Sequence, residues 1–175
     1  MRVRKLYPVP KPFPPAPDLK YPPDVPAFEF SYRGVGESRM ILDPLRRKYV
    51  KLTPEEWVRQ NFVQYLIRDR GCPRGLIAIE KGFLYLGAPC RADVLVADRR
   101  GRPLMVTECK APEIRLTQRT FDQLAHYNRV LKAPFLTVSN GAQHFCCRID
   151  HEALTTTFLD VIPSYEEMLE WSQPE

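Results

Sequence analysis

The sequence predicts an α/β domain in which a mixed central β-sheet is flanked by helices. Segments with apolar residues at helical spacing alternate with short runs rich in valine, isoleucine and leucine, and this order is typical of α/β proteins. The chain has 175 residues, of which 44% are hydrophobic and 27% charged, so it can enclose one core of ordinary composition. Prolines gather near the N-terminus, where they predict an extended arm.

The proline-rich segment gives the expected domain boundary. Nine of the 18 prolines lie within residues 1–26, and each fixes φ and removes a backbone donor. We therefore predict a proline-rich extended arm over residues 1–27 and one folded domain over residues 28–175. The arm is expected to pack against the domain or to stay disordered, and a ligand for a proline-recognising domain is the alternative.

The first helix is predicted to begin after Thr53. Residues 28–51 have a mixed pattern, with a possible short strand at Phe28–Tyr32. Thr53 and Glu56 then form a capping-box pattern, and a proline occupies the first helical position between them. Apolar residues recur at helical spacing until residues 69–71, where a glycine ends the pattern.

The remaining elements follow from β-rich runs, one amphipathic segment and a second capping box. Strands are expected at Leu76–Glu80 (with 83–86 extending or pairing with it), Ala92–Ala97, Leu104–Lys110, Phe135–Val138 and His144–Ile149. Helices are expected at Thr117–Leu131 and after Ser164. Asn140–Gly141 is a strong hairpin turn between the last two strands.

The hairpin predicted for residues 92–110 contains the candidate catalytic residues. If Asp98 pairs with Pro103 across the turn, Asp93 lies opposite Glu108 on the neighbouring strand. Cross-strand partners have Cβ atoms roughly 4.5–5.5 Å apart, and two carboxylates at that distance repel each other. A divalent cation such as Mg²⁺, which accepts two carboxylates and several waters, would remove the conflict.

Lys110 adds a cation to the same strand end. It follows Glu108 by two residues, so both side chains point from the same face of the strand. Two metal ligands and a lysine are the groups that metal-assisted hydrolysis of a phosphodiester requires. The alternative interpretation is structural, with two acids at a solvated sheet edge.

These residues carry a family resemblance. Arg91-Ala92-Asp93, followed by Glu108-Cys109-Lys110, resembles the PD-(D/E)xK nuclease motif, with alanine in place of the proline. Gln123 and Tyr127 match the Q-x-x-x-Y element of one branch of that superfamily. The segment from Thr53 to Gly141 resembles the N-terminal nuclease domain of type I restriction enzyme R subunits. The resemblance implies a restriction-endonuclease-like core.

The resemblance also implies a role for each matching residue. Asp93 and Glu108 would bind Mg²⁺, or Mn²⁺ as its substitute, with the Cys109 carbonyl as a third ligand. Lys110 would activate the nucleophile or stabilise charge. Glu56 would supply an extra acid, although it could equally be the capping partner of Thr53.

Two residues on the second helix complete the implied site. Gln123 and Tyr127 would line it near the DNA, and the alternative is that both are ordinary helix residues. R subunits continue into an ATP-driven translocase, but the sequence contains no GxxxxGK[ST] loop, so we do not expect ATP-dependent cleavage from this chain.

Charge and composition suggest the partners. The net charge of +5 is compatible with a polyanion, and we predict that Arg59, Arg91 and Arg119 contact DNA phosphates. Five cysteines without a CxxC pair argue against a disulfide scaffold or zinc site and favour the cytoplasm. No apolar run is long enough to span a membrane.

The predicted function is a Mg²⁺-dependent DNA endonuclease that needs a partner for specificity. Cutting both strands with one site per chain would favour a homodimer or association with other subunits of a restriction system. The alternative is a non-catalytic nucleic-acid-binding or assembly module that retains the nuclease fold.

Overall fold

The computed structural model describes residues 28–172, so the predicted arm at 1–27 lies outside the described residues. The described chain contains two β-sheets. A three-stranded sheet has the order β1-β2-β3, and a six-stranded sheet has the order β4-β5-β6-β7-β8-β9. Within residues 28–172, no helix combines the length and the apolarity that crossing a membrane requires.

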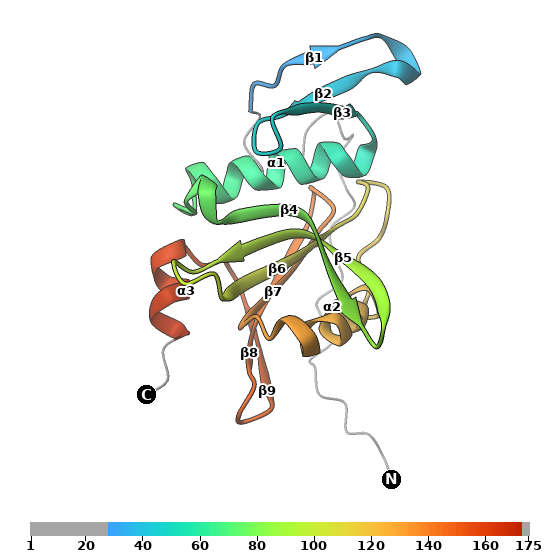
Figure 1. The fold of residues 1–175 in the computed structure, drawn as a ribbon. Helices are drawn as coiled ribbons and strands as arrows, with labels where there is room; N and C mark the ends of the chain where they lie inside the picture. The colour runs from blue at the N-terminus through green and yellow to red at the C-terminus, as the bar shows by residue number, and fades with distance from the viewer. Residues whose placement is uncertain (1–27, 173–175) are drawn as a thin grey trace.

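The small sheet precedes the first helix. Its antiparallel strands are β1 (Tyr32–Arg33), β2 (Met40–Asp43) and β3 (Lys48–Lys51), with a short 3₁₀ turn at Gly36–Ser38. The strand expected at Phe28–Tyr32 is therefore displaced, and only Tyr32 of that range is in a strand. In Figure 1 this sheet lies over α1, on the side away from the large sheet.

The first long helix begins where the capping pattern predicts. Helix α1 spans Pro54–Arg68, and the Thr53 side chain accepts a hydrogen bond from the Glu56 backbone N–H at 3.0 Å. The capping box is only half formed, because the Glu56 carboxylate binds two arginines and a glutamine elsewhere. The capping interpretation of the Glu56 side chain is therefore wrong.

The large sheet is mixed, as predicted. Its strands are β4 (Ile77–Tyr85), β5 (Ala88–Ala97), β6 (Pro103–Cys109), β7 (Phe135–Ser139), β8 (His144–Asp150) and β9 (Thr155–Leu159). Strands β6 and β7 are parallel, and each other neighbouring pair is antiparallel. A parallel pair needs a crossover, which helix α2 (Gln118–Leu131) provides.

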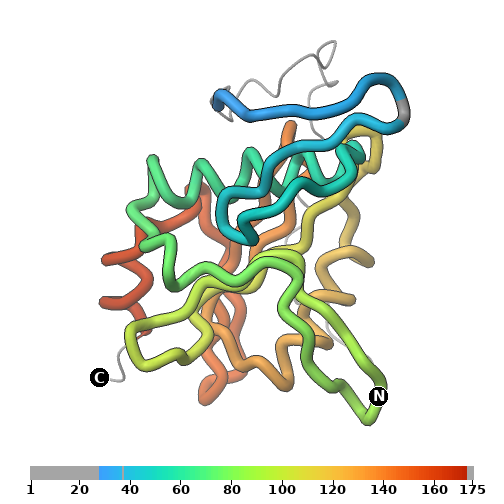
Figure 2. The backbone as a smooth tube through the Cα atoms, turned by 45° about the horizontal axis from the view of Figure 1, so that its top comes forward, coloured from blue at the N-terminus to red at the C-terminus, as the bar shows by residue number. Residues whose placement is uncertain are grey.

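Strand β4 continues through residue 85, which confirms the predicted extension of the strand over residues 83–86, and it forms a long hairpin with β5 that the sequence did not reveal. Leu86 and Gly87 make its turn with φ of 50° and 80°. Two positive φ values are typical of the tight turns of hairpins, where asparagine and glycine are usual and leucine is not. A 3₁₀ turn at Arg74–Leu76 precedes β4. The hairpin projects from the body of the molecule in Figure 2.

The hairpin of β5 and β6 has the predicted register along its body. Val94 pairs with Thr107 and Val96 with Met105, so Asp93 comes beside Glu108 as expected. The turn differs from the prediction, because Ala97 and not Asp98 pairs with Pro103. A bulge between these pairs absorbs the one-residue difference. Asp98 instead accepts hydrogen bonds from the backbone N–H groups of Arg100 and Arg102.

The C-terminal part adds one strand that the sequence did not predict and one helix that it did. Strand β9 completes the sheet edge beside β8. Helix α3 (Tyr165–Trp171) begins with a complete capping box between Ser164 and Glu167. The ring of Trp171 lies 6.2 Å from that of Phe135, so α3 packs against the sheet.

Helices cover both faces of the large sheet, and a buried cluster lies on each side. One cluster joins α1 and α3 to the sheet, and the other joins α2 to the opposite face. Figure 1 shows α1 and α2 on opposite sides of the strands. This three-layer arrangement holds the end of β6 and the middle of β5 against α1.

Candidate active site

Asp93 lies in β5, and its carboxylate is held from two sides. The residue is only 6% exposed. Its Oδ2 accepts a hydrogen bond from the Cys109 backbone N–H at 2.8 Å, and its Oδ1 accepts one from Arg59 Nη2 at 2.9 Å. The first contact ties Asp93 to β6, and the second ties it to α1.

Glu108 and Lys110 lie at the same end of the β5–β6 hairpin. Burial raises the pKa of Glu108, and the nearby charge of Asp93 raises it further. Lys110 Nζ donates to Glu108 Oε1 at 2.6 Å. Burial lowers the pKa of Lys110, but its contact with Glu108 outweighs that effect and leaves the pKa raised. The structure therefore brings the two predicted acids and the predicted lysine together.

Arg59 lies beneath this site and is almost completely buried. Its side chain is 3% exposed and contacts carboxylates of its own helix as well as Asp93. Nη2 donates to Glu55 Oε1 at 2.9 Å, and Nη1 donates to Glu56 Oε2. The prediction that Arg59 contacts DNA phosphates does not fit this position, because its donors face these carboxylates.

A second arginine extends the ion-pair network toward the small sheet. Arg46 follows β2 and binds Asp43, Glu56 and Glu80. Glu80 also accepts from Arg91 at 2.8 Å. The sequence did not identify Arg46 or Glu80 as members of this network, because 34 residues separate the pair along the chain. No local pattern signals such a contact.

The charges of this region do not cancel. Among the described residues, the network and the adjacent Glu108–Lys110 pair contain six carboxylates, from Asp43, Glu55, Glu56, Glu80, Asp93 and Glu108. They contain four cations, from Arg46, Arg59, Arg91 and Lys110. With all groups ionised, six negative and four positive charges leave an excess of two negative charges.

Asp93 and Glu108 are the side chains at this site that could bind a divalent cation. Within residues 28–172, no group of three or more histidine, cysteine or acidic side chains has an arrangement suited to a metal ion. Asp93 and Glu108 nevertheless supply two carboxylates, and Mg²⁺ is commonly bound by one or two carboxylates with waters completing its shell. The pair therefore fits a magnesium ion in donor chemistry and charge.

Cys109 contributes to the site through its backbone. Its side chain is fully buried, and burial raises the pKa of the thiol well above its ordinary value, with the Asp93 charge adding to the effect. A neutral thiol is a poor metal ligand. The prediction for this residue concerned its carbonyl oxygen, and the observed contact is made by its N–H.

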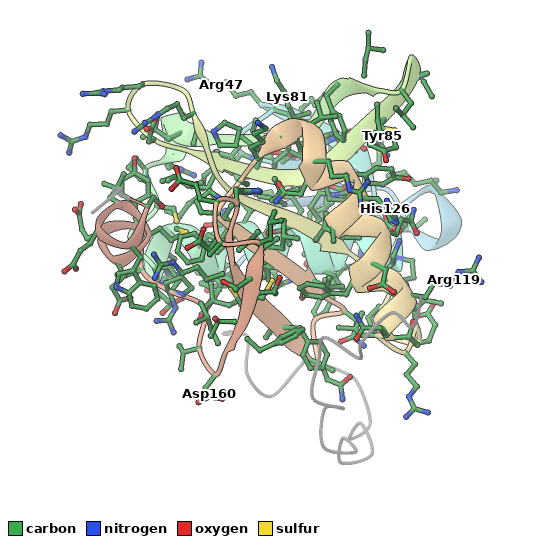
Figure 3. All side chains as sticks on the ribbon, turned by 90° about the horizontal axis from the view of Figure 1, so that it is seen from below. Arg47, Lys81, Tyr85, Arg119, His126 and Asp160 are labelled. Carbon is green, nitrogen blue, oxygen red and sulfur yellow. The ribbon has the colours of Figure 1, made fainter. Side chains whose placement is uncertain are left out.

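Gln123 and Tyr127 lie on α2 and connect it to the projecting hairpin. Gln123 Nε2 donates to the Tyr127 hydroxyl at 3.1 Å. The ring of Tyr127 lies edge-on to Phe83 at 6.1 Å and to Tyr85 at 5.8 Å. These contacts place the pair on the helix face turned toward the β4–β5 hairpin, where Figure 3 shows Tyr85 beside α2.

The other two predicted DNA contacts lie at the surface. The Arg91 side chain is 55% exposed while it contacts Glu80. Arg119 is exposed in the first turn of α2, and in Figure 3 it points away from the body of the molecule. Both side chains can reach a polyanion from their positions.

Comparison with known proteins agrees with this architecture. Residues 54–163 match the family model described as "Type I restriction enzyme R protein N terminus". The chain belongs to this family. The matched segment begins at α1, contains every predicted site residue and ends just before α3.

A solved structure shows that the fold is shared. The chain is similar to a fragment described as an HsdR subunit of a type I restriction enzyme from Vibrio vulnificus YJ016, with 21% identity and a TM-score of 0.51. The similarity covers 68% of this chain and 25% of that one, so this chain corresponds to about a quarter of its relative. A search of curated proteins found no match. The restriction-endonuclease-like fold is thereby confirmed.

Proposed function

We propose that this domain is a Mg²⁺-dependent nuclease that hydrolyses phosphodiester bonds of DNA. The observation that carries the proposal is the junction of Asp93, Glu108 and Lys110. Two acids lie on adjacent strands, the charge of one raises the pKa of the other, and the lysine contacts the second acid at 2.6 Å. Membership in the family of type I restriction R protein N termini supports this interpretation.

The chain's own residues divide the work between binding and charge stabilisation. Asp93, Glu108 and the Cys109 carbonyl would hold the cation, and Glu56 on α1 binds Arg59, which in turn binds Asp93. A bound Mg²⁺ would act as a Lewis acid toward a phosphate and lower the pKa of a coordinated water. Lys110 keeps a positive charge at the strand end, where it can stabilise a phosphate as negative charge develops.

The electrostatics of the network support a divalent cation. The whole network together with the Glu108–Lys110 pair has an excess of two negative charges, which equals in magnitude the charge of one Mg²⁺ or Mn²⁺. Charged groups held in low dielectric are costly unless they are compensated. A site of this composition favours the cation over a neutral ligand.

The expected partners follow from the site and from the family. DNA would contact the exposed arginines Arg91 and Arg119, near the projecting hairpin and α2. Other subunits of a restriction system, or a second copy of this chain, would supply specificity and the second cut. Mn²⁺ is expected to substitute for Mg²⁺.

One observation favours the second candidate, a non-catalytic DNA-binding or assembly module. Arg59 and the Cys109 N–H already satisfy one lone pair on each oxygen of Asp93. The negative charge of Asp93 is therefore partly compensated without a metal cation. A module of this kind would bind DNA equally well with and without Mg²⁺.

A cleavage assay tests the proposal. Supercoiled plasmid and single-stranded DNA are incubated with the wild type in Mg²⁺ or Mn²⁺, beside Lys110→Ala purified in the same way. Lys110 lies at a strand end and is part-exposed, so its removal should abolish cleavage and preserve the fold. Equal activity of both proteins would place the activity elsewhere. Inactivity of both, with DNA binding independent of Mg²⁺, would support the second candidate.

A further inference from the structure

We propose that Arg59 is the positioning residue of the active site, which orients Asp93 for cation binding and touches neither DNA nor the reacting atoms. The inference rests on the proposed function for its purpose, and its structural part can be tested without metal. The sequence alone suggested a phosphate contact, whereas the structure shows a guanidinium enclosed by carboxylates and 3% exposed.

The guanidinium connects Asp93 to α1. Nη2 lies 2.9 Å from both Asp93 Oδ1 and Glu55 Oε1, and Nη1 donates to Glu56. Among the described residues, no partner accepts from the buried Nε, so the two terminal nitrogens make all of these contacts. Because the fork is planar and rigid, contacts at both nitrogens restrict its orientation.

The anchor of Arg59 is itself held in place. Glu55, Glu56 and Arg59 are neighbours on α1 at helical spacing, so the pairing needs no loop to order. Glu56 also accepts from Gln60 Nε2 at 2.8 Å and from Arg46 Nη2 at 2.6 Å. Through Glu56, whose side chain is 8% exposed, Arg59 is attached to a buried framework, whereas the Glu55 side chain is 43% exposed.

The contacts leave Asp93 able to bind a cation. Its Oδ1 accepts from Arg59, and its Oδ2 accepts from the Cys109 N–H. An ionised carboxylate offers about four lone-pair sites, so each oxygen retains one. The two donors thus orient the carboxylate without exhausting it. Carboxylates that bind metals are commonly oriented by such outer hydrogen bonds.

A metal titration with a conservative variant tests the role of Arg59. Arg59→Lys keeps the charge but replaces the fork by one ammonium, which cannot bind Asp93, Glu55 and Glu56 in the same geometry. By calorimetry we expect its Kd for Mn²⁺ to rise about 10- to 100-fold, with an unchanged circular dichroism spectrum. The matched control is Arg68→Lys, an exposed arginine of the same helix that lies over the Phe28 ring, which should bind Mn²⁺ as the wild type does. A folded Arg59→Lys with wild-type affinity would overturn the proposal.

A metal-free comparison separates this inference from the nuclease proposal. Urea midpoints are measured for Arg59→Met, Asp93→Asn and the double variant. We expect the free energy of unfolding to fall less in the double variant than the sum of the decreases in the two single variants. The reason is that Asp93→Asn removes the buried charge that Arg59→Met leaves uncompensated. If the double variant folds and the single variants do not, this result would also support the coupling between Arg59 and Asp93. Additive losses, or failure of the double variant to fold, would overturn it. A wild type that binds no Mn²⁺ would instead refute the nuclease proposal.

Discussion

At the scale of single residues, the two proposed metal ligands, Asp93 and Glu108, repel each other and so lower the stability of the metal-free protein. Glu108 is largely buried beside Asp93, and among the described residues Lys110 is its ion-pair partner. Two acids that repel each other in a buried place destabilise a metal-free protein. This cost distinguishes a functional carboxylate from a structural one, and it can be measured.

We predict that Glu108→Gln stabilises the metal-free protein at neutral pH. Burial, and then Asp93, raise the pKa of Glu108, so the folded state binds that proton more tightly than the unfolded state does. The wild type therefore loses stability as the pH rises through this raised pKa, and the variant does not. The difference in Tm should be largest near pH 7 and should vanish below the ordinary glutamate pKa.

The same variant should lose its response to metal. A ligand that binds only the folded state raises stability, by roughly 2.7 kcal/mol at a concentration 100 times its Kd. Added Mn²⁺ should therefore raise the Tm of the wild type and of Glu113→Gln, an exposed control, but not that of Glu108→Gln. A less stable Glu108→Gln at pH 7 would contradict the assignment of Glu108 to a repulsive pair.

At the scale of elements, helix α1 contributes residues both to the candidate active site and to the hydrophobic core. Its first two turns contain Glu55, Glu56 and Arg59, and the rest of its inner face packs into the core. The start of this helix is therefore part of the site. Because the Glu56 side chain turns away from the cap, the Thr53 hydroxyl alone makes the side-chain capping bond.

A capping comparison tests this description. Thr53→Ala removes an oxygen that accepts from the Glu56 N–H at 3.0 Å, and it should lower the free energy of unfolding by about 1 kcal/mol. Thr117 precedes α2 without making such a bond, so Thr117→Ala is the matched control. It should lower the free energy of unfolding by less than Thr53→Ala does. Urea denaturation measures both, and an equal loss in the two variants would show that capping does not explain the start of α1.

At the scale of the whole molecule, the three layers and the projecting hairpin define one candidate DNA face. Tyr127 on α2 packs against the hairpin, and Lys81, Tyr85 and Arg119 lie along this side in Figure 3. Arg91 lies on the hairpin strand that continues to Asp93. A duplex bound here would lie near the acidic pair.

We predict that DNA binding weakens with salt and depends on these arginines. Each phosphate contact contributes roughly 0.9 to the slope of log K against log salt concentration. Arg91→Gln and Arg119→Gln should each lower the slope by about that amount in fluorescence anisotropy titrations. Arg100→Gln, exposed in the turn at the other end of β5, is the control and should leave the slope unchanged. Equal slopes in all proteins would show that Arg91 and Arg119 do not contact DNA phosphates and that DNA binds another face.

The sequence by itself determined the parts that depend on short-range patterns. Caps and periodicity placed α1, α2 and α3 within about a residue of their observed starts. The assumed pairing of Asp98 with Pro103 gave the register found along the body of the β5–β6 hairpin, which brings Asp93 and Glu108 together, although the turn itself pairs Ala97 with Pro103. These features were readable because residues close in sequence decide them, even though a bulge altered the turn.

Only the tertiary structure decided the surroundings of that pair. The burial of Arg59, the contacts of Arg46 and the role of Glu80 depend on segments 34 residues apart that meet when α1 packs on the sheet. The small sheet, strand β9 and the turn at Leu86 and Gly87 were also missed, because weak local preferences yield there to pairing with a neighbouring strand. An arginine in a sequence shows only its charge, and whether it faces DNA or a buried carboxylate depends on what packs against it.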